Sequence, residues 1–352
     1  MTANPLAADL DHILAETQGL WDGLRGQHVF MTGGTGFFGR WLLESFVWVN
    51  DRLNLGAQVT VLTRNPDAFR GQAPHLAGDP AIHLAAGDVR TFGFPQGEFS
   101  HVIHAATEAD LSLMATAPLQ VFDVNVEGTR RVLEFARQAG VHRFLFTSSG
   151  AVYGRQPADL ERLPEDFPGG PDPTDTHSTY GIAGEAKRAA ESLCALYARQ
   201  FGLTTVMARC FTFVGPHLPL DGKFAIGNFL RDAMAGNPIR VGGDGTPYRS
   251  YLYAADLAIW LWTMLIRGAR GHAYNVGSEF GGPLAAVARA VGDGVTPPLP
   301  VHIAHAPDLA LPPSRYVPCT RKARTELGLR ETVDLKEAIR RCLGWLQQRP
   351  RT

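Results

Sequence analysis

Hydrophobic residues recur with two alternating periods along the first 210 positions of the chain. Short, continuous apolar runs such as HVFMT at 28–32 are typical of strands that are buried on both faces of a parallel sheet. Between these runs lie longer segments in which apolar residues return every three or four positions, as on one face of a helix. The helix predicted after the first strand, for example, turns Trp41, Leu42, Phe46 and Val49 inward.

This alternation predicts repeated strand–helix–strand units, and such units build a parallel sheet with helices on both faces. We therefore expect an α/β fold with a Rossmann-type, doubly wound parallel sheet. An amphipathic helix at 9–24 is expected to precede it. The predicted strands are 28–32, 58–63, 81–85, 101–105, 143–148 and 203–209, and the later predicted helices are 118–139 and 184–201.

After about residue 210 the regular alternation breaks, and glycine and proline become dense, as in AGNPIRVGGDGTPYR. This change predicts a smaller, irregular α/β lobe that is woven back into the first one. The larger domain is expected to span 1–208 plus 252–277, with 1–26 as an N-terminal helical extension, and the smaller lobe to span 209–251 plus 278–352.

Charge and cysteine content argue against several classes of protein. The net charge of −1 is unlike that of a nucleic-acid binder, which usually carries a basic face. The four cysteines form no CxxC pair and no metal-ligand spacing, so we expect free thiols and no metal site. The N-terminus lacks a basic segment followed by an apolar run, and the longest apolar patch contains Asp256, so we expect a cytoplasmic protein without a membrane span.

A glycine-rich stretch, TGGTGFFG at 32–39, places Gly33, Gly36 and Gly39 directly after a predicted strand and at the start of a predicted helix. Glycines there let the backbone turn sharply and approach a pyrophosphate, whose negative charge is stabilised by the amino end of the helix. Because the motif stands in this context, it predicts a dinucleotide-binding site.

This stretch and four later motifs resemble the extended, nucleotide-sugar-modifying branch of the short-chain dehydrogenase/reductase superfamily, the NAD-dependent epimerase/dehydratase family. The four motifs are GDVR (87–90), HAAT (104–107), NVEGTRRVLEFA (125–136) and TSSGAVYG (147–154). The resemblance spans nearly the whole chain. It implies an enzyme that modifies a nucleoside-diphosphate sugar with the help of a nicotinamide cofactor.

The resemblance also implies which residues bind the cofactor. Asp88 matches an aspartate that contacts adenine, and Asn125 matches a structural asparagine. Arg64 stands at the end of the second strand, where an acidic residue would bind the ribose of NAD and an arginine can pair with the 2′-phosphate of NADP. We expect NAD and keep NADP as an open alternative. The full set is Gly33, Thr35, Gly36, Phe37, Phe38, Gly39, Arg64, Asp88, Val89, Ala105, Ala106, Thr107, Asn125, Thr147, Tyr180, Lys187, Cys210 and Phe211.

In the family, a tyrosine accepts or returns the proton of a sugar hydroxyl while the nicotinamide takes or gives a hydride. A phenol has a pKa of about 10, so a neighbouring ammonium is needed to stabilise its anion near neutrality. By motif position the resemblance implies that the tyrosine is Tyr180, the lysine is Lys187, and the serine that shares the substrate's hydrogen bond is Ser149.

The spacing between the tyrosine and the lysine departs from the family pattern, because Lys187 follows Tyr180 by seven residues instead of four. Seven residues of α-helix keep two side chains on one face but separate them by about 10.5 Å, against about 6 Å for four. We favour a helix that starts near Gly184, with the segment GIAG looped out so that Tyr180 stays in the site. Otherwise Ala183 takes the place of the tyrosine. The site then recruits another group, with Tyr153 as the nearest spare phenol, or the chain is a cofactor-binding regulatory protein without turnover.

The positions after Ser149 bear on the reaction. Sugar dehydratases and decarboxylases of this branch place acidic residues directly after the catalytic serine or threonine, whereas this chain has Gly150 and Ala151. We therefore expect a sugar epimerase or a keto-sugar reductase. A nucleotide-sugar 4,6-dehydratase is the alternative if Glu108 or Asp110 supplies the missing acid.

The second lobe resembles the family's substrate lobe. Asn228 matches an asparagine at the diphosphate, and Arg249 and Arg315 match arginines that clamp a nucleoside diphosphate through bidentate pairs. Lys223 is a further candidate for a phosphate contact. The predicted substrate-binding residues are Ser149, Gly150, Ala151, Asn228, Arg249 and Arg315.

The resemblance finally implies a homodimer. Its interface would be formed by the predicted helices 118–139 and 184–201, with apolar contacts from Leu193, Leu196 and Tyr197.

Overall fold

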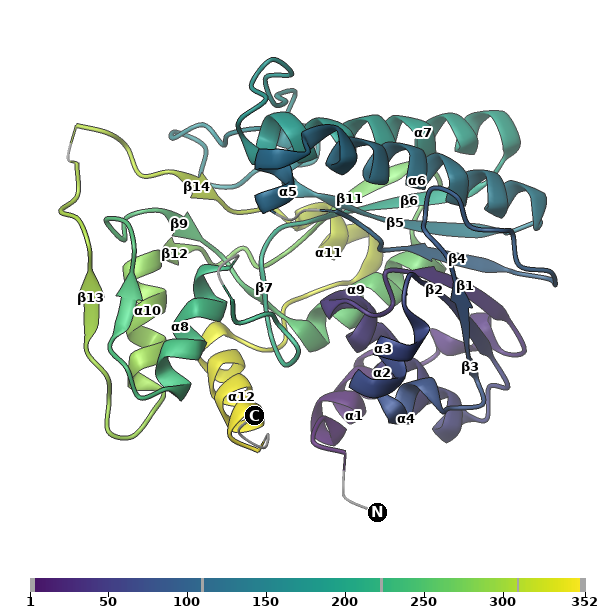
Figure 1. Cartoon of the computed structure of the whole chain (residues 1–352), viewed down its shortest axis with the longest axis horizontal. Coiled ribbons are helices and arrows are strands. Elements are labelled where there is room, and N and C mark those ends of the chain that lie inside the picture. Colours follow the sequence, from purple (N-terminus) through teal and green to yellow (C-terminus); the bar gives the residue numbers. More distant parts are fainter. Residues whose placement is uncertain (1–3, 109–110, 222–223, 309, 349–352) are drawn as a thin grey trace.

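The structure, a computed structural model, describes residues 4–108, 111–221, 224–308 and 310–348. Its centre is a seven-stranded parallel sheet in the order β3-β2-β1-β4-β5-β6-β11 (Figure 1). The order runs outward in both directions from β1, as in a doubly wound sheet, and the change of direction between β1 and β4 is where such folds bind ligands. The strands are β1 (His28–Thr32), β2 (Gln58–Thr63), β3 (Ile82–Ala86), β4 (His101–His104), β5 (Arg143–Ser149), β6 (Thr204–Cys210) and β11 (His272–Val276).

The six strands predicted before residue 210 are all present, and their ends differ from the prediction by at most one residue. This agreement has a physical reason. The inner strands are buried on both faces and therefore contain continuous apolar runs, and β1, β4 and β5 are almost wholly buried. The predicted α/β class and the doubly wound sheet are confirmed.

Helices cover both faces of this sheet (Figure 1). One face is covered by α6 (Pro118–Gln138) and α7 (Glu185–Phe201), which pack side by side. The other face is covered by α2 (Phe37–Leu53) and α9 (Ala254–Arg267), and α1 (Ala7–Glu16) packs against both of them. The shorter helices α3 (Pro66–Gln72), α4 (Pro74–Ala77) and α5 (Leu111–Thr116) lie in the connections.

The first helix is shorter than predicted. α1 ends at Glu16, and only a 3₁₀ turn over Trp21–Leu24 follows. Thr17 interrupts the helix, because its hydroxyl donates to the carbonyl of Ile13 and accepts the indole N–H of Trp21 at 2.7 Å. Gly19 then turns the chain with a φ of 70°. The apolar periodicity continued across this break because Leu20 and Leu24 are also buried.

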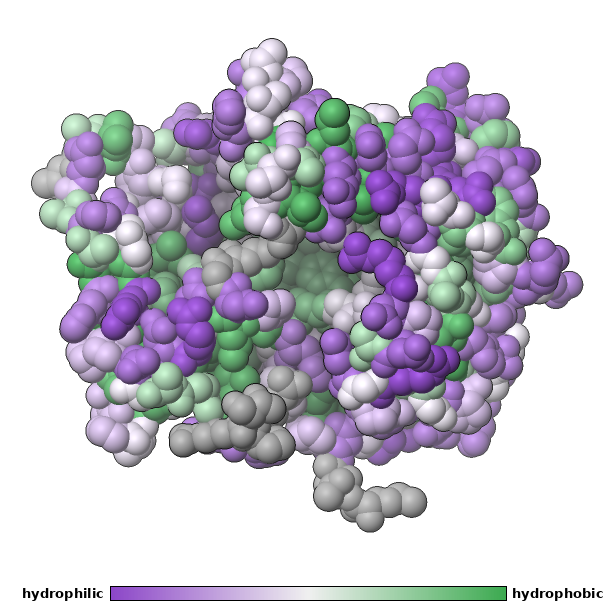
Figure 2. All heavy atoms as spheres, viewed as in Figure 1, coloured by the Kyte–Doolittle hydropathy of each residue, from purple (hydrophilic) through white to green (hydrophobic). Residues whose placement is uncertain are grey.

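The smaller lobe is built from short strands paired over long sequence distances. β7 (Phe213–Val214) pairs with β10 (Leu252–Tyr253), and β9 (Tyr248–Arg249) lies between β12 (Gly282–Pro283) and β14 (Arg315–Tyr316). The remaining elements are β8 (Ile239–Val241), β13 (Val301–Ile303), α8 (Ala225–Met234), α10 (Leu284–Asp293), α11 (Arg321–Leu327) and α12 (Leu335–Gln347). In the view of Figure 2 the surface is hollowed near its centre, between this lobe and the large sheet.

Within the described ranges, no helix is both long and apolar enough to cross a bilayer. Cys194, Cys210, Cys319 and Cys342 are free thiols, as predicted, and all but Cys319 are buried.

Asp9 joins the N-terminal helix to two distant segments. Its side chain is 9% exposed, and it accepts the hydroxyl of Tyr253 on β10 at 2.7 Å and the guanidinium of Arg341 on α12 at 2.6 Å. A buried carboxylate that accepts two hydrogen bonds of this kind matters for stability chiefly because its removal leaves both donors without an acceptor.

We expect Asp9→Ala to lower the free energy of unfolding by about 2–4 kcal/mol, because the Tyr253 hydroxyl and the Arg341 guanidinium lose their partner. Urea denaturation followed by circular dichroism measures this. Asp11→Ala on the same helix is the matched control. Its side chain is 60% exposed, so we expect a change within about 0.5 kcal/mol. Equal effects of the two substitutions would contradict the role assigned to Asp9.

Candidate active site

The glycine-rich turn lies between β1 and α2, at the carboxyl edge of the sheet. At two of its positions, only glycine fits against the neighbouring backbone. A Cβ on Gly33, which has a φ of 73°, would stand 2.4 Å from the carbonyl carbon of Ala105, and a Cβ on Gly39 would stand 2.3 Å from Cα of Gly34. The turn is therefore packed tightly against the end of β4 and against its own backbone.

Gly36 is different, because a Cβ there would meet nothing closer than 3.5 Å. It is exposed, and it is the N-cap of α2 without a side-chain cap. The absent side chain thus leaves open space in front of unpaired N–H groups at a helix start, the arrangement that receives a pyrophosphate. The residues present fit a dinucleotide.

The ends of β1 and β4 are tied together beside this turn. The Thr32 hydroxyl lies 2.7 Å from Nδ1 of His104, and Nε2 of His104 lies 2.9 Å from the hydroxyl of Thr129 on α6. Burial lowers the pKa of His104 to about 3, so its ring is neutral. The backbone N–H of Ala106 donates to the Thr32 hydroxyl, which fixes the HAAT segment against the glycine-rich turn.

Asn125 on α6 holds the continuation of this segment. Its amide donates to the carbonyls of Glu108 at 2.9 Å and Val121 at 2.8 Å, and its oxygen accepts the hydroxyl of Thr107 at 2.8 Å. It therefore positions the segment that follows β4. Asp110, one of the two alternative acids, lies outside the described residues, as does Lys223.

Two arginines, Arg64 and Arg90, follow the carboxyl ends of β2 and β3. Asp88 is paired with Arg90, which donates from Nε at 2.9 Å and from a terminal nitrogen at 3.1 Å, and this pairing lowers the pKa of Asp88. Arg64 at the end of β2 is exposed and contributes to the same lowering of the pKa. Val89 is buried beneath Asp88 and packs against Gly128, where a Cβ would stand 2.8 Å from Cγ1 of Val89.

Lys187 on α7 lies beneath the end of β5. It is 5% exposed, its Nζ donates to the carbonyl of Thr147 at 2.8 Å, and it lies 4.6 Å from the ring centroid of Phe146. Burial lowers the pKa of Lys187 from 10.5 to about 8, and the thiols of Cys210 and Cys194 oppose this shift only in part. A buried lysine with a lowered pKa at the carboxyl edge of the sheet is typical of a functional site.

The segment before Lys187 is helical, so our expectation that GIAG loops out was wrong. Tyr180–Gly184 form a π-helical turn, η3, which continues directly into α7. A π turn takes up additional residues within a continuous helix, and such turns are frequent at functional sites. Tyr180 and Lys187 therefore belong to one continuous helical segment.

Close packing explains the two glycines of this turn. A Cβ on Gly181 would stand 1.9 Å from the carbonyl oxygen of Asp175, and a Cβ on Gly184 would stand 2.7 Å from the carbonyl oxygen of Ala151. Ala183 is buried with Ile182, Met114 and Val121 in a small apolar cluster between η3, α5 and α6. The structure therefore places Ala183 in packing between helices.

Ser149 ends β5 and begins the short turn Gly150–Tyr153, where its hydroxyl accepts the N–H of Ala151 at 3.1 Å. Tyr153, the alternative phenol, makes hydrogen bonds to residues other than Ser149. Its hydroxyl donates to Asn275 at 2.7 Å and accepts from Arg209 at 2.9 Å, and burial raises its pKa. Tyr180 is partly exposed and lies within electrostatic reach of a second phenol, Tyr316.

Tyr316 was missed by the sequence analysis. Its hydroxyl lies beside Gly150, where a Cβ would stand 2.7 Å from it, and its ring centroid is 4.7 Å from that of Phe211. Burial raises the pKa of Tyr316, and a hydrogen bond with the Ser149 side chain opposes this shift. The only signal in the sequence was its position next to Arg315, since nothing there shows that β14 pairs with β9.

That pairing also separates the two predicted arginines. Arg249 is paired with Tyr316, and Tyr248 is paired with Arg315. Because side chains alternate along a strand, Arg249 shares a face with Tyr316, while Arg315 extends from the other face and stacks over the ring of Tyr248 at 4.2 Å. Asn228 on α8 is partly buried and accepts from Arg231 at 3.0 Å.

Most of the predicted cofactor residues lie at the carboxyl ends of four neighbouring strands and at the start of α2. Gly33, Thr35, Gly36, Phe37, Phe38 and Gly39 follow β1, Ala105, Ala106 and Thr107 follow β4, Thr147 lies at the end of β5, and Cys210 and Phe211 lie at the end of β6. Phe38 packs edge-on against Phe213 at the start of the smaller lobe.

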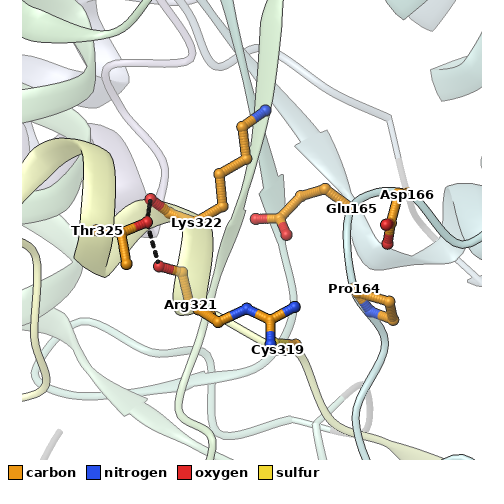
Figure 3. Close-up of a pocket in the computed structure, with 7 residues that line it drawn as sticks. All are labelled: Pro164, Glu165, Asp166, Cys319, Arg321, Lys322 and Thr325. Carbon is orange, nitrogen blue, oxygen red and sulfur yellow. Dashed lines mark hydrogen bonds between the residues drawn. The ribbon is translucent and has the colours of Figure 1, made fainter.

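A cavity of about 560 Å³ lies apart from these side chains, at the outer edge of the sheet (Figure 3). Glu165 accepts the N–H of Asn275 at 2.8 Å, and Lys322 donates to the carbonyl of Ala273 at 2.9 Å, so both bind the backbone of the edge strand β11. The cavity therefore lies where a loop and α11 cover the free edge of the sheet. Its lining residues are Pro164, Glu165, Asp166, Cys319, Arg321, Lys322 and Thr325.

Comparison with known proteins agrees with this geometry. The chain is 27% identical over 327 residues to UDP-glucuronic acid decarboxylase 1 of Arabidopsis thaliana, covering 93% of this chain and 71% of that protein. Its fold is similar to that of UDP-glucuronic acid 4-epimerase from Bacillus cereus in complex with NAD, with a TM-score of 0.76, 19% identity and coverage of 92% and 97%. It is also similar to the dTDP-glucose 4,6-dehydratase DesIV from Streptomyces venezuelae with NAD bound, with a TM-score of 0.75, 22% identity and coverage of 92% and 97%.

A family model matches residues 29–277, which contain the glycine-rich turn, β5, η3 and Lys187. This match covers more than half of the chain and includes the whole central sheet apart from the first residue of β1. The chain belongs to the NAD dependent epimerase/dehydratase family.

Proposed function

We propose that the chain is a nucleotide-sugar epimerase or keto-sugar reductase that uses NAD, with Ser149, Tyr180 and Lys187 as its catalytic residues. The larger domain (1–208 plus 252–277) would hold the dinucleotide, and the smaller lobe (209–251 plus 278–352) would hold a nucleoside-diphosphate sugar. Bound NAD would supply the group that takes a hydride from the sugar carbon or returns it.

The packing around Gly150 is the observation that favours these two reactions. A Cβ there would stand 2.7 Å from the Tyr316 hydroxyl and 2.8 Å from the ring of Phe211, so a carboxylate side chain has no room next to Ser149. Ala151 is 7% exposed, and its carbonyl lies against Gly184. Removal of water from a sugar requires a further acid and base. The residues after Ser149 do not provide them.

The chain's own residues have separate roles in the proposed reaction. Tyr180 would exchange the proton of a sugar hydroxyl, and Ser149 would bond to the same oxygen. The ammonium of Lys187 would favour the anionic form of a nearby phenol and bind the ribose hydroxyls of the cofactor. Arg249, which lies on the Tyr316 side of β9, would pair with the diphosphate.

The exposed apolar side chains on α6 and α7 support a homodimer through these helices. Leu119 is 76% exposed, Leu196 52% and Phe201 46%. The predicted contact residue Leu193 is only 8% exposed and packs inside the protomer, whereas Tyr197 is partly exposed and bonds to Glu134 at 3.1 Å.

The proposed function is tested with a panel of UDP-, dTDP-, GDP- and CDP-sugars, supplied with NAD or with NADPH and analysed by mass spectrometry. An epimerase gives a product of unchanged mass, and a reductase gives a product with two added hydrogens while NADPH is consumed. A product that has lost water would establish the dehydratase instead. Cofactor binding without any reaction or sugar binding across the panel would support the regulatory alternative and exclude the enzyme.

We expect Tyr180→Phe to lower turnover about 10²–10⁴-fold, because the proton of the sugar hydroxyl loses its acceptor. Nucleotide binding, measured by calorimetry with UDP or dTDP, should stay within about twofold. Tyr274→Phe is the matched control, since this phenol on β11 bonds to Glu326 at 2.8 Å, away from Ser149. Unchanged turnover in Tyr180→Phe would remove this residue from the mechanism.

The burial of Lys187 generates a prediction about stability and pH. A pKa lowered from 10.5 to about 8 corresponds to a penalty of about 3 kcal/mol for the folded protein at neutral pH. Between these two values the unfolded chain holds the proton and the folded chain does not, so the penalty disappears as the pH rises.

We therefore expect Lys187→Met to raise the free energy of unfolding of the cofactor-free protein by about 1–3 kcal/mol at pH 7. This advantage should shrink as the pH rises from about 8 to 10.5, in urea denaturation at several pH values. Lys336→Met, at an exposed position on α12, should show no such change with pH. A destabilised Lys187→Met at pH 7 would contradict the penalty.

A further inference from the structure

The residue directly before Ser149 is held by a buried ion pair. Glu191 on α7, which is 9% exposed, accepts the hydroxyl of Ser148 at 2.5 Å. The same carboxylate accepts from Arg209 on β6, at 3.0 Å from Nε and at 2.8 Å from a terminal nitrogen. The carboxylate therefore joins the last turns of β5 and β6 to one helix.

Arg209 extends this contact to the other side of Ser149. Its second terminal nitrogen donates to the Tyr153 hydroxyl at 2.9 Å, and its guanidinium lies 4.8 Å from the centroid of the Tyr153 ring. Tyr153 is the last residue of the short turn that begins directly after Ser149, and its hydroxyl donates to Asn275 on β11 at 2.7 Å. Ser149 thus lies between two segments that are both bound to the Glu191–Arg209 pair.

The pair also lies on the helix that carries Lys187. Glu191 follows Lys187 by four residues, so the two side chains share one face of α7. Lys187 donates to the carbonyl of Thr147, and Glu191 accepts from Ser148. Two successive residues of β5 are therefore held by two successive turns of one helix, and the next residue along the strand is Ser149.

We propose that Glu191, paired with Arg209, is a positioning residue that fixes Ser149 relative to the helix of Lys187 through its hydrogen bond with Ser148. This inference rests on the proposed function. Catalytic groups must be held closely in register, since a misplacement of about 1 Å can lower turnover about 10²-fold. The ion pair supplies such a constraint from outside the set of residues assigned to proton transfer.

A purely electrostatic role for Glu191 makes a different prediction. The carboxylate also favours the charged form of Lys187. If this were its contribution to turnover, loss of its charge would shift the pH dependence of kcat, whereas loss of the Ser148 hydroxyl would have no effect. Ser148→Ala separates the two roles, because it removes the hydrogen bond and leaves every charge in place.

The experiment compares Ser148→Ala, Glu191→Gln and the double variant on the sugar that the wild type converts, with kcat expressed per folded molecule and the folded fraction taken from circular dichroism. We expect Ser148→Ala to lower kcat about 5- to 20-fold, with KM within about twofold and an unchanged pH dependence. Glu191→Gln should lower kcat at least as much. The double variant should lie within about twofold of Glu191→Gln, because both substitutions act on the same contact.

Ser45→Ala is the matched control for the loss of a buried serine hydroxyl. Ser45 on α2 is fully buried and donates to the carbonyl of Trp41 at 2.7 Å, away from β5. We expect this variant to lose stability in urea denaturation and to keep the kcat of the wild type per folded molecule.

A kcat of Ser148→Ala equal to that of Ser45→Ala would overturn the inference, since the bond would then serve stability alone. Full additivity of the losses in the double variant would overturn it as well. Failure of the proposed function is recognised separately, by a wild type that converts no sugar or by a Tyr180→Phe variant that retains turnover.

Discussion

The hydrogen bond between the Lys187 ammonium and the Thr147 carbonyl is the contact on which the site depends. It joins α7 to the end of β5, and these two elements, with the π turn η3 that leads into α7, carry all three proposed catalytic residues. Burial of this ammonium is unfavourable for the folded protein. The nearby thiols and the carboxylate of Glu191 offset only a small part of that unfavourable free energy. The position of Ser149, at the last residue of β5, is fixed by the same strand. A second connection lies nearby, because Glu191 on α7 binds Ser148 at 2.5 Å and Arg209 at 2.8 Å.

The sequence predicted the central sheet closely and the smaller lobe only in outline. β1, β4 and β5 each contain a run of buried apolar residues, so the pattern of single residues is enough to find them. β9 and β14 are two residues each and lie more than 60 positions apart, and pairs of this kind leave no periodic signal. For that reason Tyr316 was not predicted, and the opposite faces of Arg249 and Arg315 were not anticipated.

The candidate site shows the same division. Gly33, Ser149 and Lys187 could be proposed from the sequence because they belong to short motifs that surround a buried strand. The conformation of residues 180–184 was not, since seven residues between two side chains are compatible with an α-helix, a loop or a π turn. The decisive contacts are the close approaches of Gly181 to Asp175 and of Gly184 to Ala151, and these form only in the folded chain.

Asp9 has a consequence for how the two parts of the molecule are placed. It fastens the first helix to β10 and to α12, which belong to the smaller lobe, and it lies on the side of the sheet covered by α2 and α9. These contacts tie the N-terminal helix on one side of the sheet to two segments of the smaller lobe, so the N-terminal extension contributes to the relative placement of the two parts of the molecule.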